Sequence, residues 1–173
     1  MSSRASPSPE AWAVPDEEGW LPPHQPNCLG CGDENPAGLG LRLRMDGDHV
    51  RGEVTLDRRH EGAPGFAHGG AVATLLDDAL GTILLVRGRP AVTARLEIDY
   101  RRPVLIGQRI EIEVWLARIE GRKLHLAGTL TGDELLAEAK AIFVEVGREH
   151  FLKGAGPVPE GWHGVSPPST LPW

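Results

Sequence analysis

The stretch that decides the fold runs from Gly65 to Gly81 and reads GFAHGGAVATLLDDALG. A histidine and two glycines lead into an apolar run with helical spacing, which continues to Val86. Two adjacent aspartates, Asp77 and Asp78, stand in the middle of that run. The pattern predicts one long helix of about 18 residues that carries two carboxylates among apolar side chains.

This helix is apolar on almost every side. The stripe expected to face a sheet consists of Val72, Leu76, Ala79, Ile83 and Val86. The opposite side carries Ala73, Thr74, Gly81, Leu84 and Leu85. One curled sheet cannot bury both sides, so a second copy of the subunit is the expected cover. Carboxylates at such an interface cost several kcal/mol in desolvation unless they are paired or functional. An aspartate on a helix is also commonly solvated, and periodicity does not choose between Asp77 and Asp78.

Strand-like alternation surrounds the helix. A hairpin is expected at residues 39–45 and 49–56, before the helix, and four further strands are expected in a meander at residues 91–100, 109–119, 123–130 and 134–146. One helix cannot cover both faces of such a sheet, but the sheet can curl around the helix. We therefore predict an α+β fold in which a curled antiparallel sheet of about six strands wraps one long central helix.

Composition is consistent with one compact domain in a chain of 173 residues with 40% hydrophobic residues. The net charge of −6 and the lack of a Lys/Arg run argue against nucleic-acid binding. We expect no membrane-spanning run and no signal peptide, and therefore a cytoplasmic protein. Residues 1–26 and 148–173 have the composition of irregular Pro-rich tails around a domain at 27–147. Their tryptophans, Trp12, Trp20, Trp162 and Trp173, suggest that parts of the tails dock on the domain.

Two cysteines occur in CLGCG, and a histidine precedes them. His24, Cys28 and Cys31 give the spacing H-x3-C-x2-C, which offers three ligands for zinc. A closed zinc site needs a fourth ligand, which His49 or His60 could supply only if the fold brings one of them close. The interpretation preferred from sequence is a turn with reduced thiols and no metal.

The start of the predicted helix has a chemistry of its own. Gly69 and Gly70 are expected to leave first-turn N–H groups uncovered, and such donors polarise a carbonyl oxygen or hold an oxyanion. Asp77 lies seven residues beyond Gly70, or about 10 Å along the axis. A reacting group must come within about 3 Å, so one subunit's Asp77 cannot serve its own glycines. Two subunits with antiparallel helices about a two-fold axis would share each site.

Three segments follow one another along the chain: CLGCGDENPAGLGL (Cys28–Leu41), GAPGFAHGGAVATLLDDALG (Gly62–Gly81) and VTARLEIDYRRPV (Val92–Val104). In sequence and in order they resemble the hotdog-fold acyl-CoA thioesterases of the PaaI type, most closely the THEM-like branch. The resemblance extends from about Asn27 to Val146 and excludes both tails. It implies a hotdog fold and hydrolysis of an acyl-CoA by a homodimer or a dimer of dimers, without a cofactor.

The resemblance also implies roles for individual residues. The catalytic acid falls on Asp77, nine residues after His68, and Asp78 is left with a structural role. The helix-start donor falls on Gly70 with Gly69 beside it, His68 supports the turn, and Thr93 lies near the attacking water. The family often has Asn six residues before the histidine, where this chain has Gly62; nearby His60 or Glu61 would have to compensate.

Substrate contacts are expected around this centre. Arg101 and Arg102, with Arg58 and Arg59 in the earlier loop, are candidates for the phosphates of coenzyme A. Ala73 and Leu84 would line the path of the acyl chain. Asp77 would act as a general base on water or attack the carbonyl directly. The alternatives are an acyl-CoA hydratase or dehydratase, a non-catalytic acyl-CoA-binding module, and a structural protein that docks through its tails.

Overall fold

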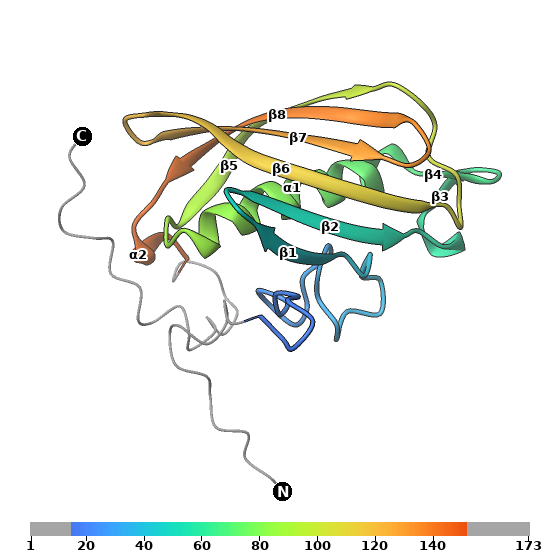
Figure 1. The fold of residues 1–173 in the computed structure, drawn as a ribbon, viewed down its shortest axis with the longest axis horizontal. Helices are drawn as coiled ribbons and strands as arrows, with labels where there is room; N and C mark the ends of the chain where they lie inside the picture. Colours follow the sequence, from blue (N-terminus) through green and yellow to red (C-terminus); the bar gives the residue numbers. More distant parts are fainter. Residues whose placement is uncertain (1–14, 152–173) are drawn as a thin grey trace, which may run out of the picture.

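The computed structural model describes residues 15–151 of the chain (Figure 1). A 3-10 turn, Arg58–His60, precedes the two short strands β3 and β4. In chain order the elements are β1 (Arg42–Asp46), β2 (His49–Thr55), β3 (Glu61–Ala63), β4 (Phe66–Ala67), α1 (Gly69–Val86), β5 (Ala91–Tyr100), β6 (Arg109–Glu120), β7 (Lys123–Thr131), β8 (Leu135–Glu145) and α2 (Arg148–Phe151).

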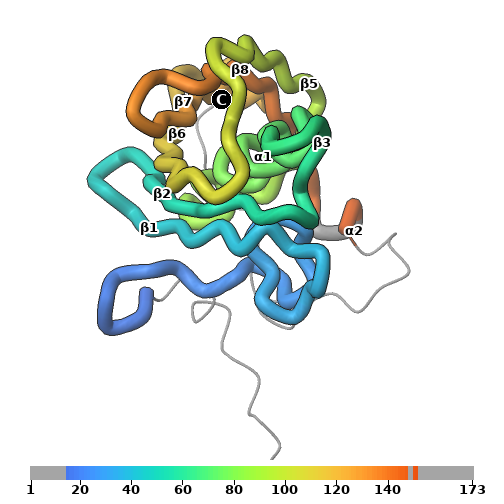
Figure 2. Tube along the Cα trace, turned by 90° about the vertical axis from the view of Figure 1, so that its right-hand side faces the viewer, coloured from blue at the N-terminus to red at the C-terminus, as the bar shows by residue number. Residues whose placement is uncertain are grey.

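Six of the strands form one antiparallel sheet in the order β1-β2-β6-β7-β8-β5, and β3 and β4 pair with each other as a separate two-stranded sheet. The sheet curls, and α1 lies on its concave side, where it contacts β2, β5, β6, β7 and β8 (Figure 2). The α+β prediction of about six strands around one central helix is confirmed, as are the first hairpin and the 18-residue helix.

The predicted four-strand meander is wrong in one respect. Strands β6, β7 and β8 are successive neighbours, but β5 pairs with β8 instead of β6. The reason is that β6 already pairs with β2 along one edge and with β7 along the other. Strand β5 therefore lies at the far edge of the sheet and closes it over the side of α1.

The core forms where the sheet covers α1. The strand residues that point inward, among them Val50, Ile110 and Val114, have no exposed surface. From the predicted helix stripe, Val72, Leu76, Ala79 and Ile83 are buried and Val86 is half-buried. Leu84, expected on the opposite side of the helix, is only 1% exposed within a single subunit. That expectation was wrong, because the sheet curls far enough around the helix to cover it.

Helix α1 also passes the length and hydropathy test for a membrane span, with 18 residues and a mean hydropathy of 1.5. The expectation that no run is long and apolar enough is therefore corrected. The same apolar side chains pack against five strands of the sheet, which accounts for their composition without a bilayer.

The segment before β1 docks on the domain. The Leu21 N–H donates to the Leu43 carbonyl at 2.7 Å. The Trp20 ring lies under two guanidinium groups, with Arg42 at 4.4 Å and Arg44 at 5.2 Å from its centroid. The prediction of a docking tail tryptophan is confirmed for Trp20. Trp12, Trp162 and Trp173 lie outside the described residues.

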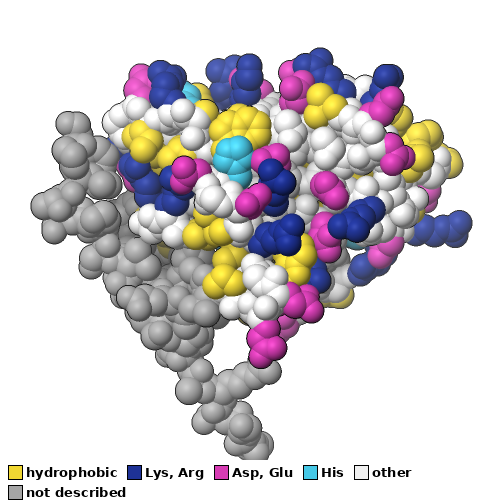
Figure 3. Space-filling model, in the orientation of Figure 1, with side chains coloured by type: hydrophobic (Ala, Val, Ile, Leu, Met, Phe, Trp, Pro, Cys, Tyr) yellow, Lys and Arg dark blue, Asp and Glu magenta, His cyan; other side chains and the backbone are white. Residues whose placement is uncertain are grey.

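On the face of the molecule shown in Figure 3, acidic and basic side chains are interspersed. Cross-strand ion pairs join charged side chains of the sheet, for example Arg109 with Glu53 at 2.6 Å. Arg51 likewise bridges Asp46 at 2.9 Å and Glu113 at 3.1 Å. Exposed pairs of this kind contribute at most about 1 kcal/mol each, so burial around α1 dominates the stability.

Leu76→Ala tests that conclusion. Leu76 has no exposed surface, so its truncation removes transfer free energy and leaves a cavity. We expect the free energy of unfolding, measured by urea denaturation, to fall by about 2–5 kcal/mol. Leu105→Ala is the control, because Leu105 is 49% exposed and should cost less than about 1 kcal/mol. Equal losses for the two variants would contradict this account of the core.

Candidate functional site

The structure separates the two aspartates that periodicity left equivalent. Asp77 lies on the open side of α1, in line with Gly70 and Ala73 at the spacing of a helical face. It is half-buried, and one of its carboxylate oxygens accepts a hydrogen bond from the Thr93 hydroxyl at 2.8 Å. Asp78, one residue further, points under the loop that precedes β1. Asp77 is thus the carboxylate that a substrate can reach.

Thr93 owes its position to an irregularity in β5. The pairing of β5 with β8 shifts register between Thr93 and Arg95. Thr93 is exposed, and its hydroxyl points at Asp77 across the space between the edge strand and the helix. A hydroxyl that donates to one carboxylate oxygen fixes the orientation of the carboxylate while leaving the other oxygen available.

The helix start differs from expectation at Gly70. His68 is the N-cap, with φ −64° and ψ 134°, and its Nδ1 accepts the Gly70 N–H at 2.8 Å. The N–H groups of Ala71 and Val72 donate to the His68 carbonyl. The Gly70 donor is therefore occupied by the loop histidine and not uncovered. In the described part of the chain, the Gly69 N–H has no hydrogen-bond acceptor, so it is the donor left free at the helix start.

Tyr100, which the sequence patterns did not single out, ties this turn to the sheet. Its hydroxyl donates to the Gly69 carbonyl at 2.9 Å. A tyrosine at the end of an alternating strand gives no signal that distinguishes it from any half-exposed aromatic. The contact brings the end of β5, and with it Arg101 and Arg102, to the start of α1.

Neither of these arginines is without a partner. Arg101 pairs with Glu138 at 2.8 Å and Asp99 at 3.4 Å, and Arg102 pairs with Glu134 at 2.9 Å. Both guanidinium groups are more than half exposed. In the earlier loop, Arg59 is held by Asp57 and by the Pro36 carbonyl.

The loop before the helix explains why Gly62 stands where the family often has Asn. A Cβ on Gly62 would lie 2.9 Å from the His68 Cα, so a larger residue would displace the helix N-cap. His60 is 8% exposed, and its backbone carbonyl accepts a hydrogen bond from the His68 N–H at 2.8 Å. It lies beneath the site and not on its surface. Glu61 is exposed, and its carboxylate accepts the Gly65 N–H.

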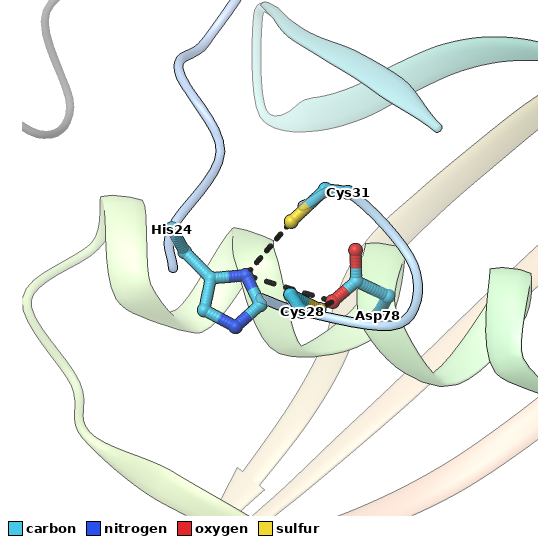
Figure 4. Close-up of side chains that lie close together, drawn as sticks. All are labelled: His24, Cys28, Cys31 and Asp78. Carbon is cyan, nitrogen blue, oxygen red and sulfur yellow. Dashed lines mark hydrogen bonds and ion pairs between the residues drawn. The ribbon is translucent and has the colours of Figure 1, made fainter. Parts of the chain in front are cut away.

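A second cluster forms around Asp78, shown in Figure 4. The Cys28 Sγ lies 3.1 Å from Asp78 Oδ1, and His24 Nδ1 lies 3.5 Å from the same oxygen and 3.0 Å from Cys31 Sγ. Burial raises the pKa of the Asp78 carboxyl to about 7. Contact with the Cys31 thiol lowers the pKa of Cys28, and contact with Cys28 together with burial raises that of Cys31.

The histidines considered as fourth partners of this cluster lie elsewhere. His49 contacts Glu113 at 2.6 Å, and His60 Nδ1 accepts the Asp57 N–H at 3.2 Å. The fold brings neither of them close to the cluster, so neither supplies a fourth ligand. Asp78 joins His24, Cys28 and Cys31 instead, a juxtaposition that sequence spacing could not give because Cys28 and Asp78 are 50 residues apart.

Comparison with known proteins finds similarity to thioesterases over the region that contains this site. The sequence pattern of the thioesterase superfamily matches residues 64–139, from the loop before α1 to β8. Acyl-coenzyme A thioesterase THEM4 of Mus musculus is 40% identical over 95 residues, which cover 53% of this chain and 41% of that protein. The Bos taurus protein of the same name is 39% identical over 92 residues, covering 51% and 38%. The chain thus spans about two-fifths of the length of these relatives.

A solved structure has the same fold. A thioesterase superfamily protein superposes with a TM-score of 0.62 at 33% identity, covering 65% of this chain and 60% of the other. The matched region of the sequence contains His68, both glycines, Asp77 and Thr93.

Proposed function

We propose that this chain, whose residues 64–139 match the pattern of the thioesterase superfamily, hydrolyses the thioester of an acyl-coenzyme A to a free acid and coenzyme A. Both relatives described above carry the name acyl-coenzyme A thioesterase. The observation that carries the proposal is the placement of Asp77, a carboxylate on the open face of α1 that is oriented by Thr93. A solvated structural aspartate would need no such partner.

Asp77 takes one of two roles in this reaction. As a general base it removes a proton from water, whose oxygen bonds to the thioester carbon. The C–S bond then breaks, and coenzyme A leaves as the thiol once its sulfur is protonated. As a nucleophile, Asp77 forms a transient anhydride that water hydrolyses. In both routes the Thr93 hydroxyl holds one carboxylate oxygen, so the other faces the reacting centre.

The thioester oxygen needs a donor, and the Gly69 N–H supplies it. The developing negative charge lies at the start of α1, where the helix dipole favours an anion. His68 keeps the Gly70 N–H satisfied and fixes the turn. Asp77 lies eight residues beyond Gly69, or about 12 Å along the axis, so the donor must come from a different copy of the chain.

A homodimer through the β5 edge brings these groups together. β5 has 10 residues, and among residues 15–151 it pairs through one side only, with β8. An edge of this length presents unpaired N–H and C=O groups to a partner strand. Antiparallel pairing of two β5 strands about a two-fold axis places the two α1 helices antiparallel side by side. Asp77 of each subunit then approaches Gly69 of the other, with two sites per dimer.

The substrate occupies the space around this interface. Ala73, half-buried on the open face of α1 between Gly69 and Asp77, lines the path of the acyl chain. Arg101 and Arg102 bind the phosphates of coenzyme A at the end of β5. Their present carboxylate partners are exposed, and such pairs are worth at most about 1 kcal/mol, so phosphate can replace them at little cost.

The direct test is thiol release from a panel of acyl-coenzyme A esters of different chain length, including an aromatic ester, with the acid identified by mass spectrometry. We expect stoichiometric free acid and coenzyme A from at least one member of the panel. Tight binding without hydrolysis would favour the non-catalytic module. Addition of water to an enoyl ester without thiol release would favour the hydratase.

A further inference from the structure

Four potential metal ligands from distant parts of the sequence meet beneath the loop that precedes β1. Nδ1 of His24, the sulfurs of Cys28 and Cys31 and a carboxylate oxygen of Asp78 all lie within 4.8 Å of one another. We propose that these four side chains form a zinc site that fastens the N-terminal loop to helix α1. The site is separate from the thioesterase chemistry, which uses Asp77.

The distances fit a tetrahedral ion. With Zn–S of about 2.3 Å and Zn–N or Zn–O of about 2.0 Å, neighbouring ligands lie about 3.3–3.8 Å apart. The observed separations are 3.5 Å for His24 Nδ1 to Asp78 Oδ1, 3.1 Å for Cys28 Sγ to Asp78 Oδ1 and 3.0 Å for Cys31 Sγ to His24 Nδ1. These three separations lie within a few tenths of an ångström of the range for zinc, and no pair of the four donors is more than 4.8 Å apart. In Figure 4 the side chains converge from the loop and from α1 onto one space.

The buried carboxylate of Asp78 favours a cation beside it. Its side chain is 8% exposed, and Oδ2 is buried without a hydrogen-bond partner. Among the described residues, no Lys or Arg forms an ion pair with it, and His24 is its one basic neighbour. A thiol is a weak donor and does not offset the burial of a carboxylate. A divalent ion bound by Asp78 places a positive charge directly against the carboxylate oxygen.

The backbone of the turn at residues 28–32 (CLGCG) directs the cysteine sulfurs toward Asp78. The Gly30 N–H donates to the Cys28 sulfur at 3.3 Å, and the Gly32 N–H donates to the Cys28 carbonyl at 3.0 Å. A Cβ on Gly30 would lie 2.5 Å from the Asp78 Cγ. Only a glycine allows the turn to approach the helix this closely. An N–H that points at a ligand sulfur stabilises its negative charge, as outer partners of metal ligands do.

The ligand types select the ion and its role. Two thiolates and an imidazole favour zinc over Mg²⁺ or Ca²⁺, which take oxygen ligands. Four protein ligands leave no open position for water, which is typical of a structural site. The ion would hold the loop against the turn of α1 that also carries Asp77.

The test uses the full chain, treated with a chelator and titrated with Zn²⁺, with metal content measured by mass spectrometry. We expect one zinc per chain and a higher melting temperature with the metal. Cys28→Ser, Cys31→Ser and Asp78→Asn should each weaken binding by at least about 100-fold, more than the ~10–100-fold that outer partners are worth. Asp77→Asn is the matched control, since it changes the adjacent carboxylate and should retain zinc.

Cobalt keeps the test decisive if a variant fails to fold. Wild-type chain loaded with Co²⁺ should show thiolate-to-metal charge-transfer bands and the strong ligand-field bands of a tetrahedral site. Weak octahedral bands without charge transfer would overturn the proposal. A wild-type chain that has both cysteines reduced but binds less than one metal ion per chain would overturn it as well. Zinc that remains bound in all three ligand variants would place the ion elsewhere and also refute it.

Discussion

Asp77→Asn is expected to lower acyl-coenzyme A turnover by at least about 100-fold, the loss that follows removal of a positioned base. Asparagine keeps the shape of the side chain and can still accept the Thr93 hydroxyl, which now donates at 2.8 Å. The amide is neither a base nor a useful nucleophile. Initial rates should fall while the melting temperature and the KM stay close to wild type.

Asp78→Asn is the natural comparison, because it makes the same chemical change one residue away. It disturbs the contacts with His24 and Cys28, so its main effect should be on zinc content and thermal stability. Per folded chain, it should retain at least about tenfold more turnover than Asp77→Asn. Small and equal losses of turnover in the two variants would remove Asp77 from the mechanism.

Sequence patterns predicted the parts of this fold that depend on local spacing. Helix α1 and the first hairpin follow from periods of 3.6 and 2 residues, which report which side chains are buried. The place of β5 did not follow, because strand order depends on which edges other strands already occupy. Leu84 was misplaced for a related reason: the extent of sheet curl is a property of the whole sheet.

The candidate site was predicted in the same uneven way. The resemblance selected Asp77, and the structure supplied the physical distinction, since Asp77 faces Thr93 while Asp78 lies under the cysteine turn. The occupied Gly70 donor could not be foreseen, because a histidine side chain folding back on its own helix depends on the loop beneath it. The contact between Asp78 and Cys28 could not be predicted either, because only tertiary packing brings these two residues together.

Gly69→Pro is expected to lower turnover by about 100- to 1000-fold, the loss found when one oxyanion donor is removed. Proline deletes the N–H while suiting the first position of a helix. His68 before it already has the extended backbone, φ −64° and ψ 134°, that a residue preceding proline prefers. Gly69→Ala is the control: it keeps the N–H, and its Cβ would meet the Tyr100 hydroxyl at an ordinary 3.6 Å, so it should lose much less.

Combining this variant with Asp77→Asn tests whether each site is shared between two chains. In a mixed dimer of Asp77→Asn and Gly69→Pro subunits, one site combines both defects. The other site is intact, because the Gly69→Pro subunit supplies its Asp77 and the Asp77→Asn subunit supplies its Gly69. Co-expressed with two affinity tags and purified through both, the mixed dimer should regain about half of the wild-type turnover, although each parent is nearly inactive. A mixed dimer no more active than its parents would mean that donor and acid act within one subunit. The roughly 12 Å between them along α1 leaves no geometry for that, so the assignment of one of the two groups would then have to be abandoned.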